Sequence, residues 1–205
     1  EKVDLISGAS SISRNDVVFG TEPSTVAAGQ MFYKDVSIDV PAGQPDGQYV
    51  GRMAWLFEDN YTQDGLREPE EPQSAFNISC QVGQLIIEVP ETSVSTSGYP
   101  NATSAAVVFS ASNIGTLRLV NPVATASELV CGVNVIPAAE SLFQPSTIGY
   151  IVQGQTKAVS WQVNIPANTP AGVYTGVLTV WNDANRDGQI GAGEVRDSAA
   201  LELTV

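Results

Sequence analysis

Residues 183–194 have the residue types and the spacing of a calcium-binding loop. They lie in the stretch WNDANRDGQIGAGEV, and the oxygen-bearing side chains at the first, third, fifth and twelfth positions are those of Asp183, Asn185, Asp187 and Glu194. Gly188 stands sixth, so the full pattern D-x-[DN]-x-[DN]-G-x5-E is present. Calcium binds about six to eight hard oxygen ligands in a flexible geometry, which this set supplies.

Each position of the loop has an expected role. Asp183, Asn185 and Asp187 would each give a side-chain oxygen, and Gln189 would give its backbone carbonyl. Glu194 would complete the shell with both carboxylate oxygens, and a water molecule would fill the remaining place. Because Asp, Asn and Gly also favour tight turns, an Asx-rich turn without metal is the alternative interpretation.

The residues around this loop predict strands rather than the helices that usually flank it. The run GVLTVW precedes the loop, and Leu201, Leu203 and Val205 alternate with polar residues after it. A calcium sensor works by opening a pair of helices, and a hairpin has no such pair. We therefore expect a structural Ca²⁺ ion that joins two strands, in a calcium-rich setting outside the cell.

A weaker version of the loop occurs in FEDNYTQDGLREPEE. When Asp64 and Gly65 are aligned with Asp187 and Gly188, the corresponding ligand positions are Asn60, Thr62, Asp64, Leu66 and Glu71. Two acidic ligands are lost in this register. The sequence leaves open a degenerate calcium site or a plain acidic turn.

Composition limits the classes of function. The chain has 205 residues, of which 43% are hydrophobic, and 22 acidic residues against 9 basic ones give a net charge of −13. Such a charge opposes binding to nucleic acid and to anionic lipid. No apolar run reaches membrane-spanning length. Since the sequence opens at Glu1 without an initiator methionine, we expect a processed protein or an excised fragment.

An internal repeat indicates two related domains. GQMFYKDVSIDVPAGQPDGQYVGRMAW, from Gly29, aligns with GQTKAVSWQVNIPANTPAGVYTGVLTV, from Gly154. The matched pairs are Pro41 and Pro166, Pro45 and Pro170, Gly47 and Gly172, Tyr49 and Tyr174, and Gly51 and Gly176. The many short apolar runs between turn residues predict an all-β chain of two Ig-like or fibronectin-like antiparallel β-sandwich domains.

The two copies differ in completeness. We expect a first domain over residues 1–82 and a second over residues 83–205, which contains the calcium loop. Residues 83–124 have no counterpart in the first copy, so the first sandwich lacks its opening strands. The sequence leaves open which strands complete the first sandwich. They could be residues preceding the first copy, residues 83–124 shared between the two domains, or a strand donated by another subunit, for which residues 1–7 are the candidate donor.

The repeated segments resemble the Ig-like β-sandwich repeats of bacterial and archaeal extracellular surface proteins. The resemblance rests on SSISRNDVVFGTEPSTVAAGQ and on the core IPANTPAGVYTG with its flanks, and it covers most of the chain. It implies an extracellular structural or accessory module, and it does not imply one reaction or one ligand.

The cysteines and tryptophans leave alternatives open. Outside the cell Cys80 and Cys131 could form a bridge between the copies, and the alternative is two separately buried thiols. Trp55, Trp161 and Trp181 lie in or beside predicted strands, where packing is favoured over a sugar-stacking platform.

The sequence favours a non-enzymatic extracellular protein. It has no histidine, no G-x-S-x-G elbow and no P-loop, and its clustered acids belong to the two loops. We predict a calcium-stabilised subunit of a cell-surface filament, layer or stalk, with copies of itself or other surface proteins as partners. The alternative is an accessory or carbohydrate-binding module of a secreted enzyme.

Overall fold

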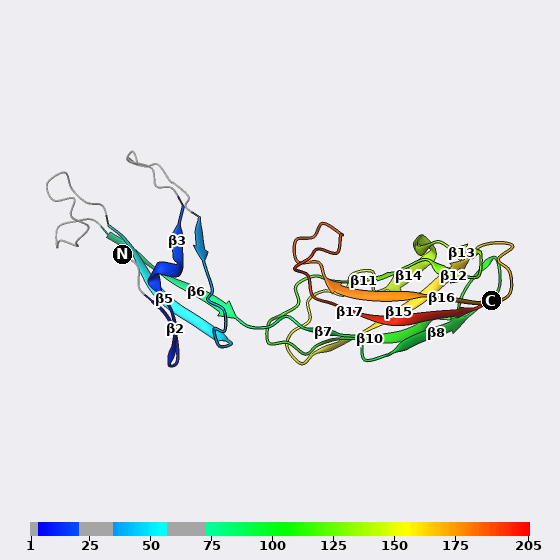
Figure 1. Cartoon of the computed structure of the whole chain (residues 1–205), viewed down its shortest axis with the longest axis horizontal. Helices are drawn as coiled ribbons and strands as arrows, with labels where there is room; N and C mark the ends of the chain where they lie inside the picture. The colour runs from blue at the N-terminus through cyan, green and yellow to red at the C-terminus, as the bar shows by residue number, and fades with distance from the viewer. Residues whose placement is uncertain (1–3, 21–34, 57–72) are drawn as a thin grey trace. The chain divides into compact units, whose positions relative to one another are not determined.

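The chain is all-β and forms two separate Ig-like units. The computed structural model describes residues 4–20, 35–56 and 73–205. It divides the chain into two compact units, Glu1–Gly83 (unit 1) and Gln84–Val205 (unit 2), which are drawn in Figure 1. Over the described ranges, no helix has the length and apolarity that crossing a membrane would need.

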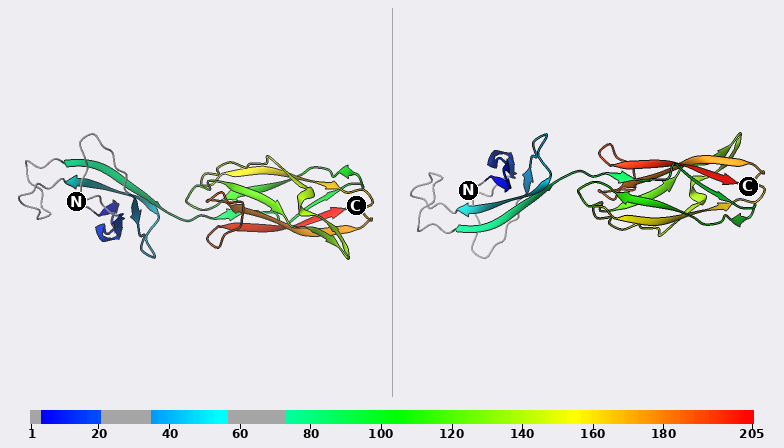
Figure 2. Two further views of the ribbon diagram at one scale, coloured as in Figure 1. Left: turned by 90° about the horizontal axis from the view of Figure 1, so that it is seen from above. Right: turned by 90° about the horizontal axis from the view of Figure 1, so that it is seen from below.

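Unit 2 is a complete two-layer β-sandwich, and Figure 2 shows its two layers facing one another. In one sheet the order is β14 (Ser141–Gln144), β15 (Thr156–Ile165), β10 (Val107–Asn113) and β7 (Ile87–Glu88), and β9 (Ala102–Thr103) also pairs with β15. In the other the order is β13 (Asn134–Ile136), β12 (Leu129–Cys131), β16 (Val173–Asn182), β17 (Arg196–Thr204) and β8 (Ser93–Ser97), and β11 (Pro122–Ala126) also pairs with β16. The pairing of β17 with β8 is parallel.

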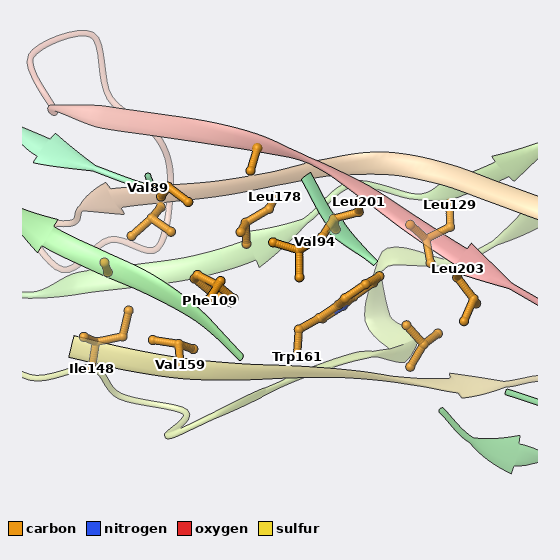
Figure 3. Packing of buried hydrophobic residues seen from close by; sticks show 14 of the residues in the cluster. Val89, Val94, Phe109, Leu129, Ile148, Val159, Trp161, Leu178, Leu201 and Leu203 are labelled. Carbon is orange, nitrogen blue, oxygen red and sulfur yellow. The ribbon is translucent and has the colours of Figure 1, made fainter. Parts of the chain in front are cut away.

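Alternation of side chains builds the core of unit 2. Along β17, Ala199, Leu201 and Leu203 are buried while the residues between them are exposed. Trp161, from the opposite sheet, is fully buried near the middle of the core shown in Figure 3, and its indole N–H donates to Ser141 Oγ at 3.2 Å. The period of two residues thus brings one face of each sheet into a single core.

In its described residues, unit 1 contains one well-paired sheet and one small pair of antiparallel strands. The sheet has the order β2 (Ser10–Ile12), β1 (Leu5–Ser7), β5 (Gly47–Leu56) and β6 (Gln73–Val82). The pair consists of β3 (Val17–Phe19) and β4 (Val36–Ile38), and the 3-10 turn η1 (Arg14–Asp16) precedes it. The corresponding turn in unit 2 is η2 (Ala138–Glu140), where the sequence IPAAESLF predicts one short turn of helix.

The two units share the same order of strands. The sheet β2-β1-β5-β6 of unit 1 corresponds to β13-β12-β16-β17 of unit 2, and β3 and β4 correspond to β14 and β15. The turn glycines of the first hairpins also correspond, with φ of 57° at Gly8 and 60° at Gly132. Among the residues described, unit 1 has no counterpart of β7, β8 or β10, and the incompleteness of the first sandwich stays a prediction.

Two of the segments expected to complete the sandwich of unit 1 are not available for that role. Residues 5–7 form β1, which pairs with β2 and β5 of its own sheet, and the side chain of Leu5 is fully buried there. A segment that is already part of the core cannot also be a free donor strand. Residues 83–124 are not shared either, because β7, β8, β9 and β10 pair with strands of unit 2.

The repeated proline and tyrosine form the same corner in both units. The hydroxyl of Tyr49 donates to the carbonyl of Pro45 at 2.9 Å, and that of Tyr174 donates to the carbonyl of Pro170 at 3.0 Å. Both tyrosine rings are fully buried in the cores. Burial raises the pKa of Tyr174 above the ordinary tyrosine value, which favours the protonated hydroxyl that donates this bond. This corner ties the start of β16 to the turn before it.

Replacing Tyr174 by phenylalanine should lower the free energy of unfolding of unit 2 by about 1 kcal/mol, because the ring stays buried and the hydrogen bond is lost. Urea unfolding followed by tryptophan fluorescence measures this change. Tyr99→Phe is the matched control, since the Tyr99 side chain is 81% exposed and should be insensitive. Equal effects of the two substitutions would contradict the role of the corner.

Candidate metal centre

The predicted calcium loop connects two long antiparallel strands. β16 ends at Asn182 and β17 begins at Arg196, so residues 183–194 lie in the hairpin connection between them. The strand predicted after Glu194 is therefore present. The two strands pair along their whole length, up to Trp181 opposite Arg196, and they hold both ends of the loop together.

Asp183, the first residue of the loop, is a buried carboxylate. Its side chain is 4% exposed. One oxygen, Oδ1, accepts the N–H of Asp187 at 3.1 Å. The other, Oδ2, accepts the N–H of Gly188 at 3.3 Å and the side-chain amide of Asn121 at 3.4 Å. These hydrogen bonds turn the backbone of the loop around the carboxylate.

The third and fifth positions continue this arrangement. Asn185 Oδ1 accepts the N–H of Asp187 at 3.1 Å, and Asn185 Nδ2 donates to Asp187 Oδ2 at 2.9 Å. Asp187 Oδ1 accepts the N–H of Gln189 at 2.7 Å. The side chains of Asp183, Asn185 and Asp187 thus turn toward the same stretch of backbone. Gly188 has a φ of 71°, a left-handed conformation that favours glycine at this bend.

Glu194 joins the end of the loop to its beginning. Its Oε1 accepts the N–H of Ala184 at 3.2 Å, and its Oε2 accepts the N–H of Gly191 at 2.9 Å. The carboxylate at the twelfth position therefore reaches back to the residue that follows Asp183. The sequence places these two residues at opposite ends of the loop, and the hairpin brings them to the same side of it.

Two asparagines that the sequence analysis did not single out support the loop from outside. Asn182 is buried, and its Oδ1 accepts the N–H groups of Val120 and Asn121 at 2.9 and 3.1 Å. The N–H of Asp183 donates to the carbonyl of Asn121 at 3.0 Å. Asn182 could have been noticed because it directly precedes the pattern. Asn121 carries no local signal, because its contact with Asp183 spans a separation of 62 positions.

The chemistry of this donor set fits a hard divalent cation. Within the described part of the chain, Asp183 is a buried carboxylate with no ion-pair partner, and a nearby cation would offset the cost of burying its charge. No group of three or more His, Cys, Asp or Glu residues in the described ranges forms a ready metal cage. The pattern differs from such a cage, because it also uses Asn185 and the carbonyl of Gln189 as ligands.

The other predicted sites have different outcomes. The degenerate loop, with Asn60, Thr62, Asp64, Leu66 and Glu71, lies outside the described residues. The predicted bridge between Cys80 and Cys131 is absent, and both cysteines are free. Each thiol packs against the core of its own unit, Cys80 in unit 1 and Cys131 in unit 2.

The aromatic side chains of unit 2 do not form a sugar-stacking row. Trp161 and Trp181 are buried. Tyr150 is exposed, and its ring contacts Arg118 and Lys157 through cation–π interactions. Tyr99 lines a hollow of about 470 Å³ together with small side chains of β8 and β9. One exposed ring in a hollow of alanines, serines and threonines is not a platform for a sugar chain.

Comparisons with known proteins give no family for this chain. No family model matches it, and no curated protein matches it. One similar solved structure is a family 123 glycoside hydrolase from Clostridium perfringens, with a TM-score of 0.42 and 10% identity, covering 60% of this chain and 27% of that one. A second is the periplasmic chaperone SfaE, with a TM-score of 0.42 and 10% identity, covering 58% of this chain and 57% of that one.

A third is the CsuC–CsuE complex of a chaperone and a tip adhesion subunit from the Csu pili of Acinetobacter baumannii. Its TM-score is 0.37 and its identity 14%, and the match covers 59% of this chain and 56% of that one. The chain thus spans less than two thirds of each of these three structures. At such TM-scores the similarities carry no argument about function, which has to come from the residues of unit 1 and unit 2.

Proposed function

We propose that this chain is a non-enzymatic building block of an extracellular or cell-surface assembly, and that a calcium ion in the β16–β17 loop stabilises unit 2. One observation carries the metal part of the proposal: the buried Asp183 carboxylate heads a hairpin loop in which oxygens of Asn185, Asp187 and Glu194 also accept backbone N–H groups of the loop. Two Ig-like units in tandem support the structural part.

Calcium would stabilise this loop because the carboxylates that repel one another would instead coordinate the same ion. Asp183, Asp187 and Glu194 carry three negative charges in one connection, and without a cation they disfavour its closed form. A bound ion would hold the end of β16 to the start of β17. Through Asn121 and Asn182 it would also fix the segment that leads into β11. The expected benefit is stability, because a hairpin has no pair of helices to open.

Adding calcium should raise the melting temperature of the full chain. A free ion concentration a hundred times the dissociation constant stabilises the bound fold by about 2.7 kcal/mol. This corresponds to a rise on the order of 10 °C in the transition of unit 2. Scanning calorimetry in calcium and in chelator measures the shift. Magnesium should give a much smaller rise, because it resists losing water and demands a rigid octahedral shell.

Two matched variants distinguish the loss of a calcium ligand from the loss of a negative charge elsewhere on the surface. Glu194→Gln should abolish most of the calcium-dependent rise, because the two-oxygen ligand is lost. Glu202→Gln removes the same charge from an exposed position on β17 and should leave the rise unchanged. If wild-type protein melts at the same temperature in calcium and in chelator, the metal proposal is wrong. Electron microscopy of the native protein tests the assembly part, since monomers alone would oppose it.

A further inference from the structure

The turn between β8 and β9 contains an acceptor sequence for an N-linked sugar. Asn101, Ala102 and Thr103 fit the pattern N-x-[ST], and the middle residue is not proline. Three residues of common types match this pattern by chance in many proteins, so the letters alone do not define a site. Three structural features of the turn do: the exposure of the Asn101 amide, the way the segment is held, and an aromatic ring close by in the chain.

The Asn101 side chain is presented to solvent by a fixed turn. Its φ of 62° lies in the left-handed region, and proline followed by such an asparagine is typical of a type II turn. The N–H of Asn101 donates to the carbonyl of Ile165 at 2.9 Å. The side chain is exposed and makes no hydrogen bond with any residue that the structure describes. Its amide nitrogen is therefore accessible to a large enzyme.

The rest of the acceptor sequence lies in a short strand that can open at low cost. β9 has only two residues, Ala102 and Thr103, which are both exposed and pair with the end of β15. The Thr103 hydroxyl donates to Asn164 Oδ1 at 2.9 Å in an exposed bond that water can replace. Because opening β9 uncovers little apolar surface, a transferase could reach the Asn101 amide and the Thr103 hydroxyl together.

Tyr99 supplies an unpacked aromatic ring two residues before the acceptor asparagine. Its side chain is 81% exposed, whereas Tyr174 is fully buried and Tyr150 contacts two cations. Within the described ranges, Tyr99 has no ring or cation partner. The first sugar on Asn101 would lie within reach of this ring, since one turn joins the two residues. A single ring suits one attached sugar residue, although it is no platform for a separate sugar chain.

The second acceptor sequence in the described ranges lacks these features. Asn77 lies in the middle of β6, opposite Arg52, in a ladder of ten consecutive pairs with β5. The next residue, Ile78, packs against the core of unit 1. Presenting Asn77 to a transferase would therefore break strand pairs on both sides and loosen the core. This contrast favours Asn101 over Asn77.

We propose that Asn101 is an N-glycosylation site whose first sugar packs on Tyr99. In the reaction, Asn101 Nδ2 forms a bond to the anomeric carbon of a sugar carried on a lipid phosphate. The bond from that carbon to the phosphate oxygen breaks, the lipid phosphate leaves, and Nδ2 gives up one proton to a base of the transferase. The inference rests on the proposed extracellular location, because such sugars mark surface loops of secreted proteins.

Peptide mass mapping of the protein purified from the cells that make it tests the site. Cleavage after glutamate releases residues 92–128, which contain Asn101 but neither Asn60 nor Asn77. The mass of this peptide should exceed that of the bare sequence by a whole number of sugar residues, and fragmentation should place them on Asn101. A peptide without sugar overturns the proposal.

Variants expressed in the same cells identify the linkage. Asn101→Gln and Thr103→Ala should both abolish the added mass, whereas Thr103→Ser keeps a hydroxyl and should retain it. All three changes are at exposed positions, so each protein should fold. Sugar that persists on residues 92–128 of the Asn101→Gln protein is attached elsewhere and overturns the proposal.

Enzymatic removal of the sugar tests the contact with Tyr99. The melting temperature of the wild-type protein should fall by about 3 °C, because the ring loses its packing partner. Tyr99→Ala should remove this difference, and Tyr150→Ala, at another exposed ring, should keep it. Equal differences in all three proteins would overturn the role of Tyr99.

The location of the protein is measured in the same cultures. Protein found outside the cells without sugar on Asn101 overturns this inference and leaves the proposed function standing. Protein found only inside the cells contradicts the proposed function itself. The calcium test is separate as well, because the N–H of Gly98 donates to the carbonyl of Thr204, at the end of β17 opposite to the calcium loop.

Discussion

Replacing Trp161 by alanine should lower the free energy of unfolding of unit 2 by about 3 to 5 kcal/mol. Trp161 is the largest of the fully buried side chains of unit 2, and it lies on β15 between the two sheets (Figure 3). Its removal leaves a cavity that the surrounding strands cannot fill, because each is held in its ladder by backbone hydrogen bonds. Chemical denaturation followed by circular dichroism measures the loss.

Two controls show whether the cavity is the cause. Trp161→Phe keeps most of the buried area and loses the hydrogen bond to Ser141, so a loss of about 1 to 2 kcal/mol is expected. Val36→Ala changes the equivalent position on β4 of unit 1, where the side chain is only half-buried, and should cost less than Trp161→Ala. A cost for Trp161→Ala no larger than for Trp161→Phe would disprove the cavity argument.

Replacing Asn113 by alanine should lower the free energy of unfolding of unit 2 by about 3 kcal/mol. The Asn113 side chain is fully buried at the end of β10. Its amide donates to the carbonyls of Leu117 and Ile151, each at 2.9 Å, and its Oδ1 accepts the N–H of Gly115 at 3.0 Å. Alanine would leave the carbonyl of Leu117 and the N–H of Gly115 without this partner in an environment that excludes water, while the carbonyl of Ile151 would keep only the N–H of Leu119.

Asn164→Ala is the matched control for this network. Asn164 lies on β15 and makes an exposed hydrogen bond with the hydroxyl of Thr103 at 2.9 Å, which water can replace. Its loss should change the free energy of unfolding by less than about 1 kcal/mol. The same urea titration compares the two variants. Similar costs at both positions would show that the Asn113 network adds little to stability.

Much of the fold could be predicted because its signal is local. KAVSWQVNI, GVLTVW and ALELTV predict strands by alternation, and the structure has β15, β16 and β17 at these places. Pairs of turn residues such as Pro166 and Gly172 mark where strands end. A period of two residues together with proline and glycine is enough to predict strands, since both act within a few positions along the chain.

Strands without an apolar alternation could not be predicted in this way. β8, with the sequence SVSTS, has one aliphatic residue, and its partner β17 is about a hundred positions away, with Ser93 opposite Ala200. β1 and β2 are three residues each, and residues 5–7, which the sequence offers as a donor strand, pair within the sheet of unit 1. Their assignment as strands depends on a neighbour that only the tertiary fold brings beside them.

For the candidate site, the sequence by itself determined which residues carry the oxygens and in what order, because a loop's ligands are spaced along one short segment. Only the tertiary structure decided that Asp183 is buried, that Asn121 and Asn182 hold the loop, and that β8 pairs with β17. Burial and pairing depend on what lies across the sandwich. The same strand pattern has neighbours on both sides as β17 of unit 2, whereas β6 pairs with β5 alone among the described residues of unit 1.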